Sequence, residues 1–393
     1  MVIPCIICLY EKFNRLNTGR KYPFGISLAV LYECRIMQEH KQLIAAEYSA
    51  GSDAHQLRQN AKPKRTLSVA PMLDWTDSHY RYMARLISRN AWLYTEMINA
   101  NAIIHGNSDR LLAYHPQEQP VALQLGGSEP AVLAQAAKIA SGYDYDEINL
   151  NCGCPSPRVQ QGAFGACLMR EVELVVQCLN AMQEAVNIPI TIKHRIGLDK
   201  ETAYQPLADF VGTLREKTAC RIFVVHARNA WLDGLSPKDN RDIPPLRYDY
   251  VYRLKQEFPD LEIILNGGVT DNAQIHRHLQ YVDGVMVGRE AYHNPMLMRS
   301  WDAEFYASHQ PAVEYEDLVN QLLDYAHRQL ANPAISLRHM ARHYLGLMHG
   351  LPGARQWRRM LSDASLLKNN NASLIAEAWQ AVKEGAANQS ELI

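Results

Sequence analysis

No apolar stretch in the 393 residues reaches the roughly 20 that a membrane-spanning helix requires, so no membrane segment is predicted. The first ten residues are apolar but have neither a basic start nor a small-residue cleavage site, which argues against a secretory signal peptide. With neither feature present, the expected location is cytoplasmic.

The chain also lacks an excess of either charge, since its formal net charge is −1. A protein that binds nucleic acid through its overall charge would be strongly basic. Any RNA contact must therefore come from a local basic patch. The content of 47% hydrophobic and 21% charged residues is that of a globular protein and does not indicate disorder.

The eight cysteines show no regular spacing, so they predict no disulfide framework and fit a reducing compartment. Cys5 and Cys8 form one CxxC pair, but no second pair follows at a suitable distance. Because structural zinc takes four ligands, no metal site is predicted. Nothing in the sequence indicates an oligomer, and a monomer is the expected state.

Three segments differ in their patterns. Residues 1–65 have weak periodicity and end in a polar stretch, which predicts a poorly ordered N-terminal extension and linker. Residues 66–300 alternate short β-branched runs with longer amphipathic stretches, and residues 301–393 have a helical pattern. The expected C-terminal helices are Val313–Leu330, Ser336–Met348 and Ser373–Lys383, the last two with serine N-caps.

The middle segment contains eight candidate strands, each followed by a stretch that can hold a helix. They are Leu67–Ala70, Trp92–Thr95, Val121–Leu125, Glu147–Asn151, Ile190–Lys193, Ile222–His226, Glu262–Asn266 and Gly284–Val287. Eight such units in about 230 residues are typical of a (β/α)8 TIM barrel. The rival is a doubly wound sheet, which would place a GxGxxG turn after the first strand, where this chain has APMLDWTD. The predicted fold is therefore an α/β TIM barrel with a C-terminal helical domain.

Polar and reactive side chains collect at the carboxyl ends of these strands, where barrel enzymes hold their active sites. In strand order, the positions are Ala70-Pro71-Met72, Gln124, Asn151, Lys193, His226, Asn266-Gly267-Gly268 and Gly288-Arg289. The strand interiors are expected to be apolar. A purely structural barrel would not need this asymmetry.

The pairs Gly267-Gly268 and Gly288-Arg289 follow strands seven and eight, which is the usual phosphate site of such barrels. Glycine lets backbone N–H groups approach a phosphate closely, and arginine can add a charged fork. Each pair alone could simply make a tight turn. Their joint occurrence at the two expected places favours a phosphate site.

Cys154 lies in a Gly-Cys-Pro turn after the fourth strand, and its thiol can donate a proton near neutral pH. Strand alternation turns Cys152, which lies nearer the strand, to the side opposite Asn151. Lys193 either forms a salt bridge inside the barrel or supplies positive charge to a cofactor ring or phosphate. His226 either binds phosphate or satisfies a neighbouring carbonyl.

Several motifs resemble, in their order along the chain, those of the tRNA-dihydrouridine synthases. They are APMLDWTD, YTEM, ALQLGG, EINLNCGCPSPRVQQGAFGACLM, IKHRIG, FVVHARNAWLDGLSPKDNR, ILNGGV and GVMVGREAYHNP. The resemblance covers about residues 66–360 and is strongest to the bacterial A-type branch, which acts on uridines 20 and 20a of the tRNA D-loop. Residues 1–60 fall outside it.

This resemblance implies bound FMN, NADPH as its reductant, hydride transfer to C6 of uracil, and protonation of C5 by a cysteine that corresponds to Cys154. Asn151 would contact the target nucleotide. Cys152 departs from the family pattern, which often has an aliphatic residue there. The implied FMN contacts are Ala70, Pro71, Met72, Gln124, Lys193, His226, Asn266, Gly267, Gly268, Gly288 and Arg289.

A basic patch for tRNA is predicted in the C-terminal segment. Between Asp324 and Asp363 the chain has no acidic residue and six arginines, namely Arg328, Arg338, Arg342, Arg355, Arg358 and Arg359. A solvated helix face is the alternative, but His339, His343, His349 and Trp357 are interleaved, which favours RNA. Lys238 and Arg241 follow strand six at the same rim. The predicted tRNA contacts are Lys238, Arg241, Arg355 and Arg358.

Two other functions remain open. A barrel flavoenzyme for a free pyrimidine would share the cofactor site but would not need the arginine-rich segment. A non-enzymatic RNA-binding protein would need the basic face but neither Cys154 nor a flavin.

Overall fold

The computed structural model describes residues 63–390. The predicted extension up to residue 62 and the pair formed by Cys5 and Cys8 lie outside the described residues. Within them, all eight predicted strands are present. They are β1 (Leu67–Val69), β2 (Leu93–Asn99), β3 (Val121–Gly126), β4 (Glu147–Cys152), β5 (Ile190–Arg195), β6 (Ile222–His226), β7 (Glu262–Asn266) and β8 (Gly284–Val287).

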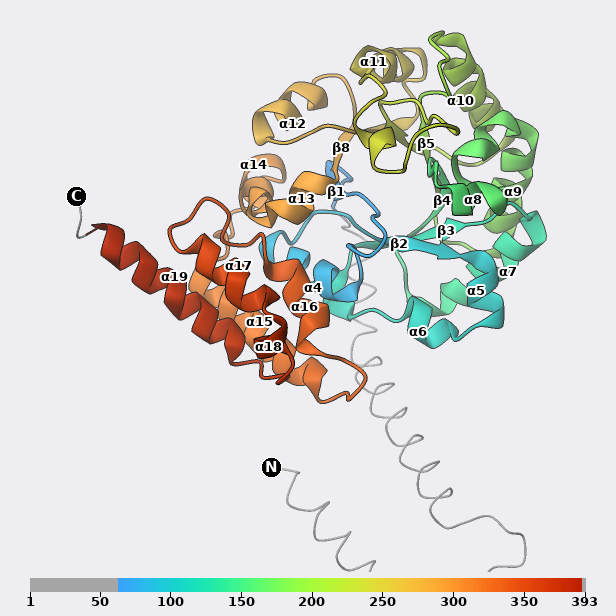
Figure 1. Cartoon of the computed structure of the whole chain (residues 1–393). Helices are drawn as coiled ribbons and strands as arrows, with labels where there is room; N and C mark the ends of the chain where they lie inside the picture. The colour runs from blue at the N-terminus through green and yellow to red at the C-terminus, as the bar shows by residue number, and fades with distance from the viewer. Residues whose placement is uncertain (1–62, 391–393) are drawn as a thin grey trace, which may run out of the picture. The chain divides into compact units, whose positions relative to one another are not determined.

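The strands form one parallel sheet in the order β1-β8-β7-β6-β5-β4-β3-β2. Its two edges meet, because the backbone N–H of Val69 donates to Trp92 O at 2.9 Å and that of Trp92 donates to Leu67 O at 3.0 Å. Figure 1 shows the resulting ring of strands surrounded by helices. This closure confirms the TIM barrel and rules out the doubly wound sheet.

Helices follow every strand and cover the outside of the barrel. They are α4 (Ser78–Ile87), α5 (Ala100–His105), α6 (Ser108–Leu112), α7 (Pro130–Ala140), α8 (Pro157–Gln161), α9 (Val172–Ala185), α10 (Gln205–Lys217), α11 (Tyr248–Glu257), α12 (Asn272–Leu279) and α13 (Arg289–His293), with short 3-10 turns η1 (Pro116–Glu118), η2 (Ser141–Tyr143), η3 (Gly165–Arg170), η4 (Asp239–Arg241) and η5 (Pro295–Ser300). No helix in the described part of the chain is both long and apolar enough to cross a membrane. The outward strand side chains and the inner helix faces form the main apolar core.

The inside of the barrel is only partly apolar. Ala70, Trp92, Tyr94, Ala122, Val224, Ile264 and Met286 form a separate buried cluster there. The expectation that the strand interiors are apolar is wrong for β4, since Glu147 is fully buried and forms an ion pair with Arg65 at 2.7 Å. The Arg65 guanidinium also lies 4.0 Å over the ring of Trp92. Arg65, at the end of the predicted linker, thus closes the floor of the barrel.

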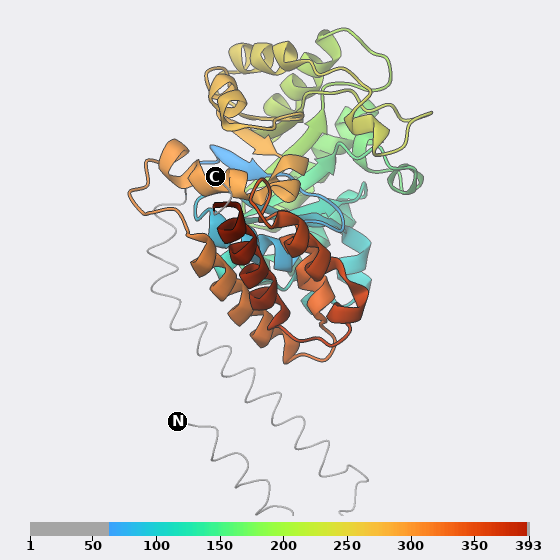
Figure 2. The ribbon, with the colours of Figure 1, turned by 60° about the vertical axis from the view of Figure 1, so that its left-hand side comes forward.

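The C-terminal segment contains the three predicted helices and others besides. They are α14 (Trp301–Phe305), α15 (Tyr315–Leu330), α16 (Leu337–Tyr344), α17 (Ala354–Ser362), α18 (Ala364–Leu367) and α19 (Leu374–Ser390). The prediction missed α17 because Pro352 and Gly353 indicated only a break, whereas Gly353 takes a positive φ of 80° and starts a helix that buries Trp357 and Leu361. Figures 1 and 2 show α15 to α19 grouped beside α4.

The C-terminal helices are anchored to α4 by polar and aromatic contacts. The Asp77 carboxylate, which caps α4, forms ion pairs with His343 at 3.0 Å and Arg342 at 2.5 Å. Tyr325 of α15 stacks on Tyr82 with ring centroids 3.9 Å apart. These contacts hold the arginine-rich helices next to the strand ends of the barrel.

Candidate active site

Lys193 reaches across the mouth of the barrel from β5 to β7. Its Nζ donates to Oδ1 of Asn266 at 3.0 Å, and the Asn266 amide donates to Met286 O at 2.8 Å. Burial lowers the pKa of Lys193 to about 7, and the nearby charge of Arg195 lowers it too. Lys193 has no carboxylate partner among the described residues, so the salt-bridge alternative is not supported there.

Asn151 holds the loop that carries Cys154. Its side-chain amide donates to Oε1 of Gln124 at 2.8 Å, while its Oδ1 accepts from the backbone N–H groups of Gly153 at 3.2 Å and Cys154 at 3.1 Å. Gln124 of β3, Asn151 of β4 and Cys154 of the following loop, all predicted site residues, are therefore joined by hydrogen bonds. The arrangement fixes the position of the Cys154 backbone at the rim.

The two cysteines of this turn have different environments. Cys154 is partly exposed, and burial raises the pKa of its thiol, although the Ser156 N–H and the charges of Arg195, Lys193 and Arg241 act in the opposite direction. A raised pKa keeps this thiol protonated near neutral pH, as a proton donor must be. Cys152 is 0% exposed in the apolar core, and burial raises the pKa of its thiol well above the usual value. The geometry separates an accessible thiol from a packed one.

The two positions after β7 require glycine, both because of their backbone conformation and because neighbouring side chains leave no room for a Cβ. Gly267 and Gly268 have φ values of 120° and 69°. A Cβ on Gly267 would lie 2.7 Å from Cδ2 of His226, and one on Gly268 would lie 2.6 Å from Cδ1 of Leu246. Burial lowers the pKa of His226 well below its usual value, so this ring is neutral where it packs against the glycine. Only glycine gives this close packing.

The ends of β1 and β8 lie side by side at the mouth. The N–H of Ala70 donates to Val287 O at 2.9 Å. A Cβ built on Gly288 would lie 3.7 Å from the Ala70 Cβ and 3.9 Å from the Met72 sulfur. The turn that follows is closed by the Met72 N–H, which donates to Thr76 Oγ1 at 2.9 Å. The predicted Ala70-Pro71-Met72 and Gly288 positions are therefore brought together.

Arg289 does not point freely into the mouth. It forms an ion pair with Asp242 at 2.6 Å and donates to Arg241 O at 3.4 Å, so it is tied to the loop after β6. Because Arg289 and Asp242 are 40% and 48% exposed, this pair contributes little to stability and can rearrange. A phosphate could take the place of Asp242.

Arg195 and Arg228 were missed as site residues. Arg195 is 3% exposed and donates to the carbonyls of Gly153, Asn229 and Asn240 at 3.0 to 3.2 Å. It has no carboxylate partner among residues 63–390, and burial lowers its pKa to about 9. The Nε of Arg228 is buried and has no hydrogen-bond partner among the residues that the structure describes. The signal for Arg195 was available, since extending β5 by two residues puts it on the same face as Lys193.

Cations thus outnumber acids at the mouth. Lys193, Arg195, Arg228, Arg241 and Arg289 surround it, and Asp242 is their one ion-pair partner in the part of the chain that the structure describes. Such an excess of buried and half-buried positive charge favours an anionic ligand. Leu73 and Ile243, on the loops after β1 and β6, are 69% and 54% exposed, which adds apolar surface at the same rim.

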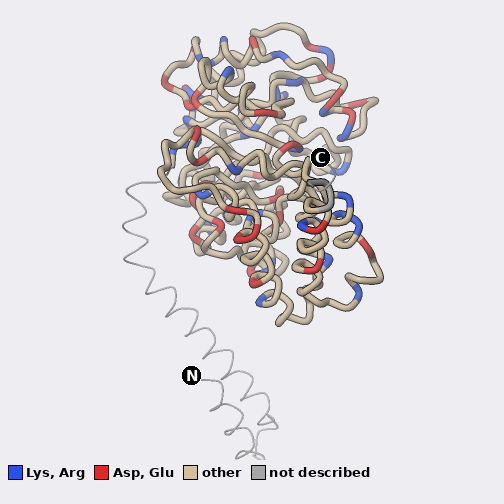
Figure 3. The backbone as a smooth tube through the Cα atoms, turned by 90° about the vertical axis from the view of Figure 1, so that its left-hand side faces the viewer, with Lys and Arg blue, Asp and Glu red and all other residues tan. Residues whose placement is uncertain are grey.

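The predicted tRNA contacts lie on two surfaces. Lys238 and Arg241 are exposed on the loop after β6, at the mouth. Arg355 and Arg358 are exposed on α17, and neither forms an ion pair within the described chain, nor do Arg338 and Arg359. Arg342 and Arg328 differ, because Arg342 pairs with Asp77 and Arg328 donates to Tyr82 OH at 3.1 Å. Figure 3 shows Lys and Arg segments along the C-terminal helices, with Asp and Glu segments among them.

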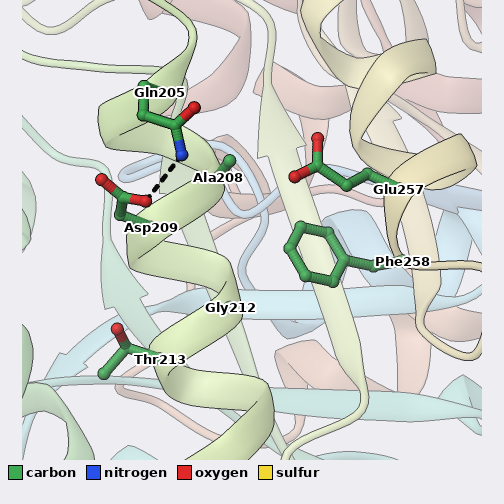
Figure 4. A pocket seen from close by; sticks show the side chains of 7 residues that line it. All are labelled: Gln205, Ala208, Asp209, Gly212, Thr213, Glu257 and Phe258. Carbon is green, nitrogen blue, oxygen red and sulfur yellow. Dashed lines mark hydrogen bonds between the residues drawn. The ribbon is translucent and has the colours of Figure 1, made fainter.

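A groove on the outer layer is unrelated to these residues. It has a volume of about 380 Å³, lies between α10 and α11 (Figure 4), and is lined by Gln205, Ala208, Asp209, Gly212, Thr213, Glu257 and Phe258. The described residues contain no cluster of three His, Cys, Asp or Glu side chains that could hold a metal ion.

Comparison with known proteins identifies the family. The family model for dihydrouridine synthase (Dus) matches residues 68–384. The tRNA-dihydrouridine(20/20a) synthase of Shewanella oneidensis is 51% identical over 321 residues, which is 81% of this chain and 94% of that protein. The proteins of the same name from Escherichia coli K12 and Vibrio vulnificus are 50% and 53% identical, over 83% and 79% of this chain and 96% and 95% of theirs.

Solved structures are similar only distantly. A 2-naphthoyl-CoA reductase complex aligns with a TM-score of 0.46 at 8% identity, over 60% of this chain and 49% of that one. Morphinone reductase aligns with a TM-score of 0.43 at 12% identity, over 66% and 93%. These two likenesses carry no weight beside the family match. The motifs and the close relatives together confirm the resemblance: the chain belongs to the dihydrouridine synthase family of oxidoreductases.

Proposed function

We propose that the protein reduces a D-loop uridine of tRNA, at position 20 or 20a, to dihydrouridine. The names of its relatives support the substrate. The observation that carries the chemistry is the partly exposed thiol of Cys154, whose pKa is raised by burial and whose loop is held by Asn151 at a cationic barrel mouth. A free pyrimidine is the alternative substrate.

The mouth fits FMN as the cofactor. Gly267 and Gly268 carry no Cβ that could shield their backbone N–H groups, and two arginines offer donors for a phosphate. They are Arg228, whose Nε has no hydrogen-bond partner among the described residues, and Arg289, which is paired with Asp242. When bound and reduced by NADPH, FMN would supply the hydride for C6 of uracil. The residues that would hold it are Ala70, Pro71, Met72, Gln124, Lys193, His226, Asn266, Gly267, Gly268, Gly288 and Arg289, with Arg228 added.

The protein's own groups then complete the reduction. Cys154 gives the proton on Sγ to C5 of the uracil ring, and the neighbouring charges of Arg195, Lys193 and Arg241 stabilise the thiolate that remains. Asn151 fixes the loop that sets the distance between thiol and base. The uridine must leave the folded D-loop to reach a barrel rim, and the surrounding tRNA would contact Lys238, Arg241, Arg355 and Arg358.

The assignment is tested by the dihydrouridine content of tRNA from cells that lack this gene and carry either the wild-type copy or none. We expect the wild-type copy to restore dihydrouridine at position 20 or 20a. Purified yellow protein that reduces free uridine but leaves tRNA unchanged would show that the substrate is a small pyrimidine. Colourless protein that binds tRNA would exclude the flavin.

FMN affinity should depend on pH through Lys193. Its pKa of about 7 means that the lysine is mostly charged at pH 6 and mostly neutral at pH 8 in the ligand-free protein. If the charged form binds the anionic cofactor, affinity falls by about tenfold over this range. Fluorescence titration of apoprotein with FMN measures it. In Lys193→Gln the pH dependence of FMN affinity that is due to the lysine should disappear, and only the dependence due to the FMN phosphate should remain. If this variant kept the wild-type pH profile, Lys193 would not contribute its charge to FMN binding.

The arginines of α17 should control tRNA affinity. Replacing Arg355 and Arg358 with glutamine removes two phosphate contacts, so affinity falls by roughly tenfold and the slope of log affinity against log salt decreases by about 1.5 to 2. Filter binding at several salt concentrations measures both quantities. The matched control replaces Arg253 and Arg277, which are exposed on the outer helices α11 and α12. Equal slopes for the two double variants would argue against this surface.

A further inference from the structure

A continuous chain of hydrogen bonds crosses the inside of the barrel, from its floor to the loop of Cys154. Thr191 Oγ1 donates to Glu147 Oε1 at 2.6 Å, and Asn149 Nδ2 donates to Thr191 Oγ1 at 2.8 Å. Gln124 Nε2 donates to Asn149 Oδ1 at 2.8 Å, and Asn151 Nδ2 donates to Gln124 Oε1 at 2.8 Å. All five side chains are at most 8% exposed.

The direction of every bond in this chain follows from its first member. A carboxylate can only accept, so the Thr191 hydroxyl must give its proton to Glu147 and can only accept from Asn149. The Asn149 amide group therefore faces Thr191 and its oxygen faces Gln124. The same reasoning turns the Gln124 oxygen to Asn151 and leaves the Asn151 oxygen for the loop.

The floor of the barrel holds Glu147 in the role of acceptor. Arg65 donates to Oε2 at 2.7 Å, and the Tyr94 hydroxyl donates to Oε1 at 2.8 Å. Burial and then the charge of Glu147 raise the pKa of Tyr94 well above its usual value, so this hydroxyl keeps its proton. Because both of these neighbours donate to Glu147, neither can reverse the direction of the hydrogen bonds that lead to Asn151.

The far end of the chain meets the reactive loop. Asn151 Oδ1 accepts from the N–H groups of Gly153 and Cys154. A reversed Asn151 would present its amide hydrogens to these two donors, and both bonds would be lost in a buried place. We infer that Glu147 is a positioning residue, which acts through Thr191, Asn149 and Gln124 to set the amide orientation of Asn151 and thereby the place of Cys154. This inference rests on the proposed role of Cys154 in uridine reduction.

The test breaks the chain at Thr191, where the shape of the side chain can be kept. Thr191→Val removes the hydroxyl without a change in volume, and Thr191→Ser retains it. Ser68→Ala is the control, because Ser68 is also buried on β1 and its hydroxyl has no partner among the described residues. Thermal unfolding shows that each variant is folded before it is compared.

The readout is alkylation of Cys154 by iodoacetamide, followed by mass spectrometry of its peptide at several pH values. Since burial is the main cause of the raised thiol pKa, a loosened loop in Thr191→Val should react about threefold faster or more at pH 8. Its turnover at saturating tRNA should fall by about tenfold. Thr191→Ser and Ser68→Ala should resemble the wild type in both measurements.

The outcomes separate this inference from the proposed function. If Thr191→Val alkylates and turns over like the wild type, the positioning role is overturned. If alkylation changes but the wild-type protein does not reduce tRNA, the positioning role stands and the substrate assignment fails. If Ser68→Ala changes as much as Thr191→Val, the effect is general packing and the inference also fails.

Discussion

Replacing Cys154 with alanine is expected to slow dihydrouridine formation at saturating tRNA by about 100- to 10,000-fold, the usual contribution of a positioned general acid. The thiol is the proposed proton donor, and it lies on the loop that Asn151 holds, near the charges of Lys193 and Arg195. Without it, C5 of the ring must take its proton from water. The proposed reduction of a bound flavin by NADPH would not involve this proton and should keep its wild-type rate.

Stopped-flow absorbance measures the two half-reactions separately, with NADPH alone and then with tRNA. Cys152→Ala is the matched control, since this thiol is fully buried in the core and should alter the rate little. Cys154→Ser keeps a hydroxyl in place but with a far higher pKa, so it should remain slow. If Cys152→Ala abolished tRNA reduction while Cys154→Ala did not, the assignment of the acid would be reversed.

The barrel could be predicted because most of its strands are short runs rich in apolar and β-branched residues, each followed by a stretch that can hold a helix. Parallel strands bring their carboxyl ends to one rim, so residues as distant along the chain as Met72, Asn151 and Gly288 could be assigned to one site from the sequence alone. The glycines after β7 were predictable for the same reason. Their positive φ values and close contacts now give the physical cause.

The other features of the site depend on side-chain contacts between residues far apart in the chain, which the sequence does not reveal. Arg195 lies just beyond the predicted end of the fifth strand at Lys193 and has no predicted role, whereas β5 continues to Arg195. The buried polar chain from Glu147 was not expected, since its members look like ordinary strand residues until Arg65 and Tyr94 are seen to satisfy the charge. Contacts with Asp77 and with Tyr82 of α4 likewise decide which arginines of α15 and α16 are tied down, namely Arg328 and Arg342.

Glu118→Gln should lower the free energy of unfolding by about 3 to 5 kcal/mol, because it leaves a buried arginine without its partner. Glu118 is 0% exposed, and its Oε2 accepts from Arg81 Nε at 2.7 Å. Its Oε1 also accepts from Ser78 Oγ and from the N–H of His115. Glutamine keeps the size of the side chain but not its charge, so Arg81 would remain buried as an unpaired cation.

The control for this change is Glu173→Gln, which removes one partner of the exposed ion pair between Lys217 and Glu173 and should alter stability by less than about 1 kcal/mol. Urea unfolding of both variants measures the difference. The damage from Glu118→Gln should extend to the site, because Arg81 Nη1 donates to Thr76 O at 2.7 Å and thereby anchors the turn that carries Met72. FMN retention should therefore fall together with stability. If Glu118→Gln and Glu173→Gln lowered the free energy of unfolding equally, the buried ion pair would contribute no more to stability than the exposed one.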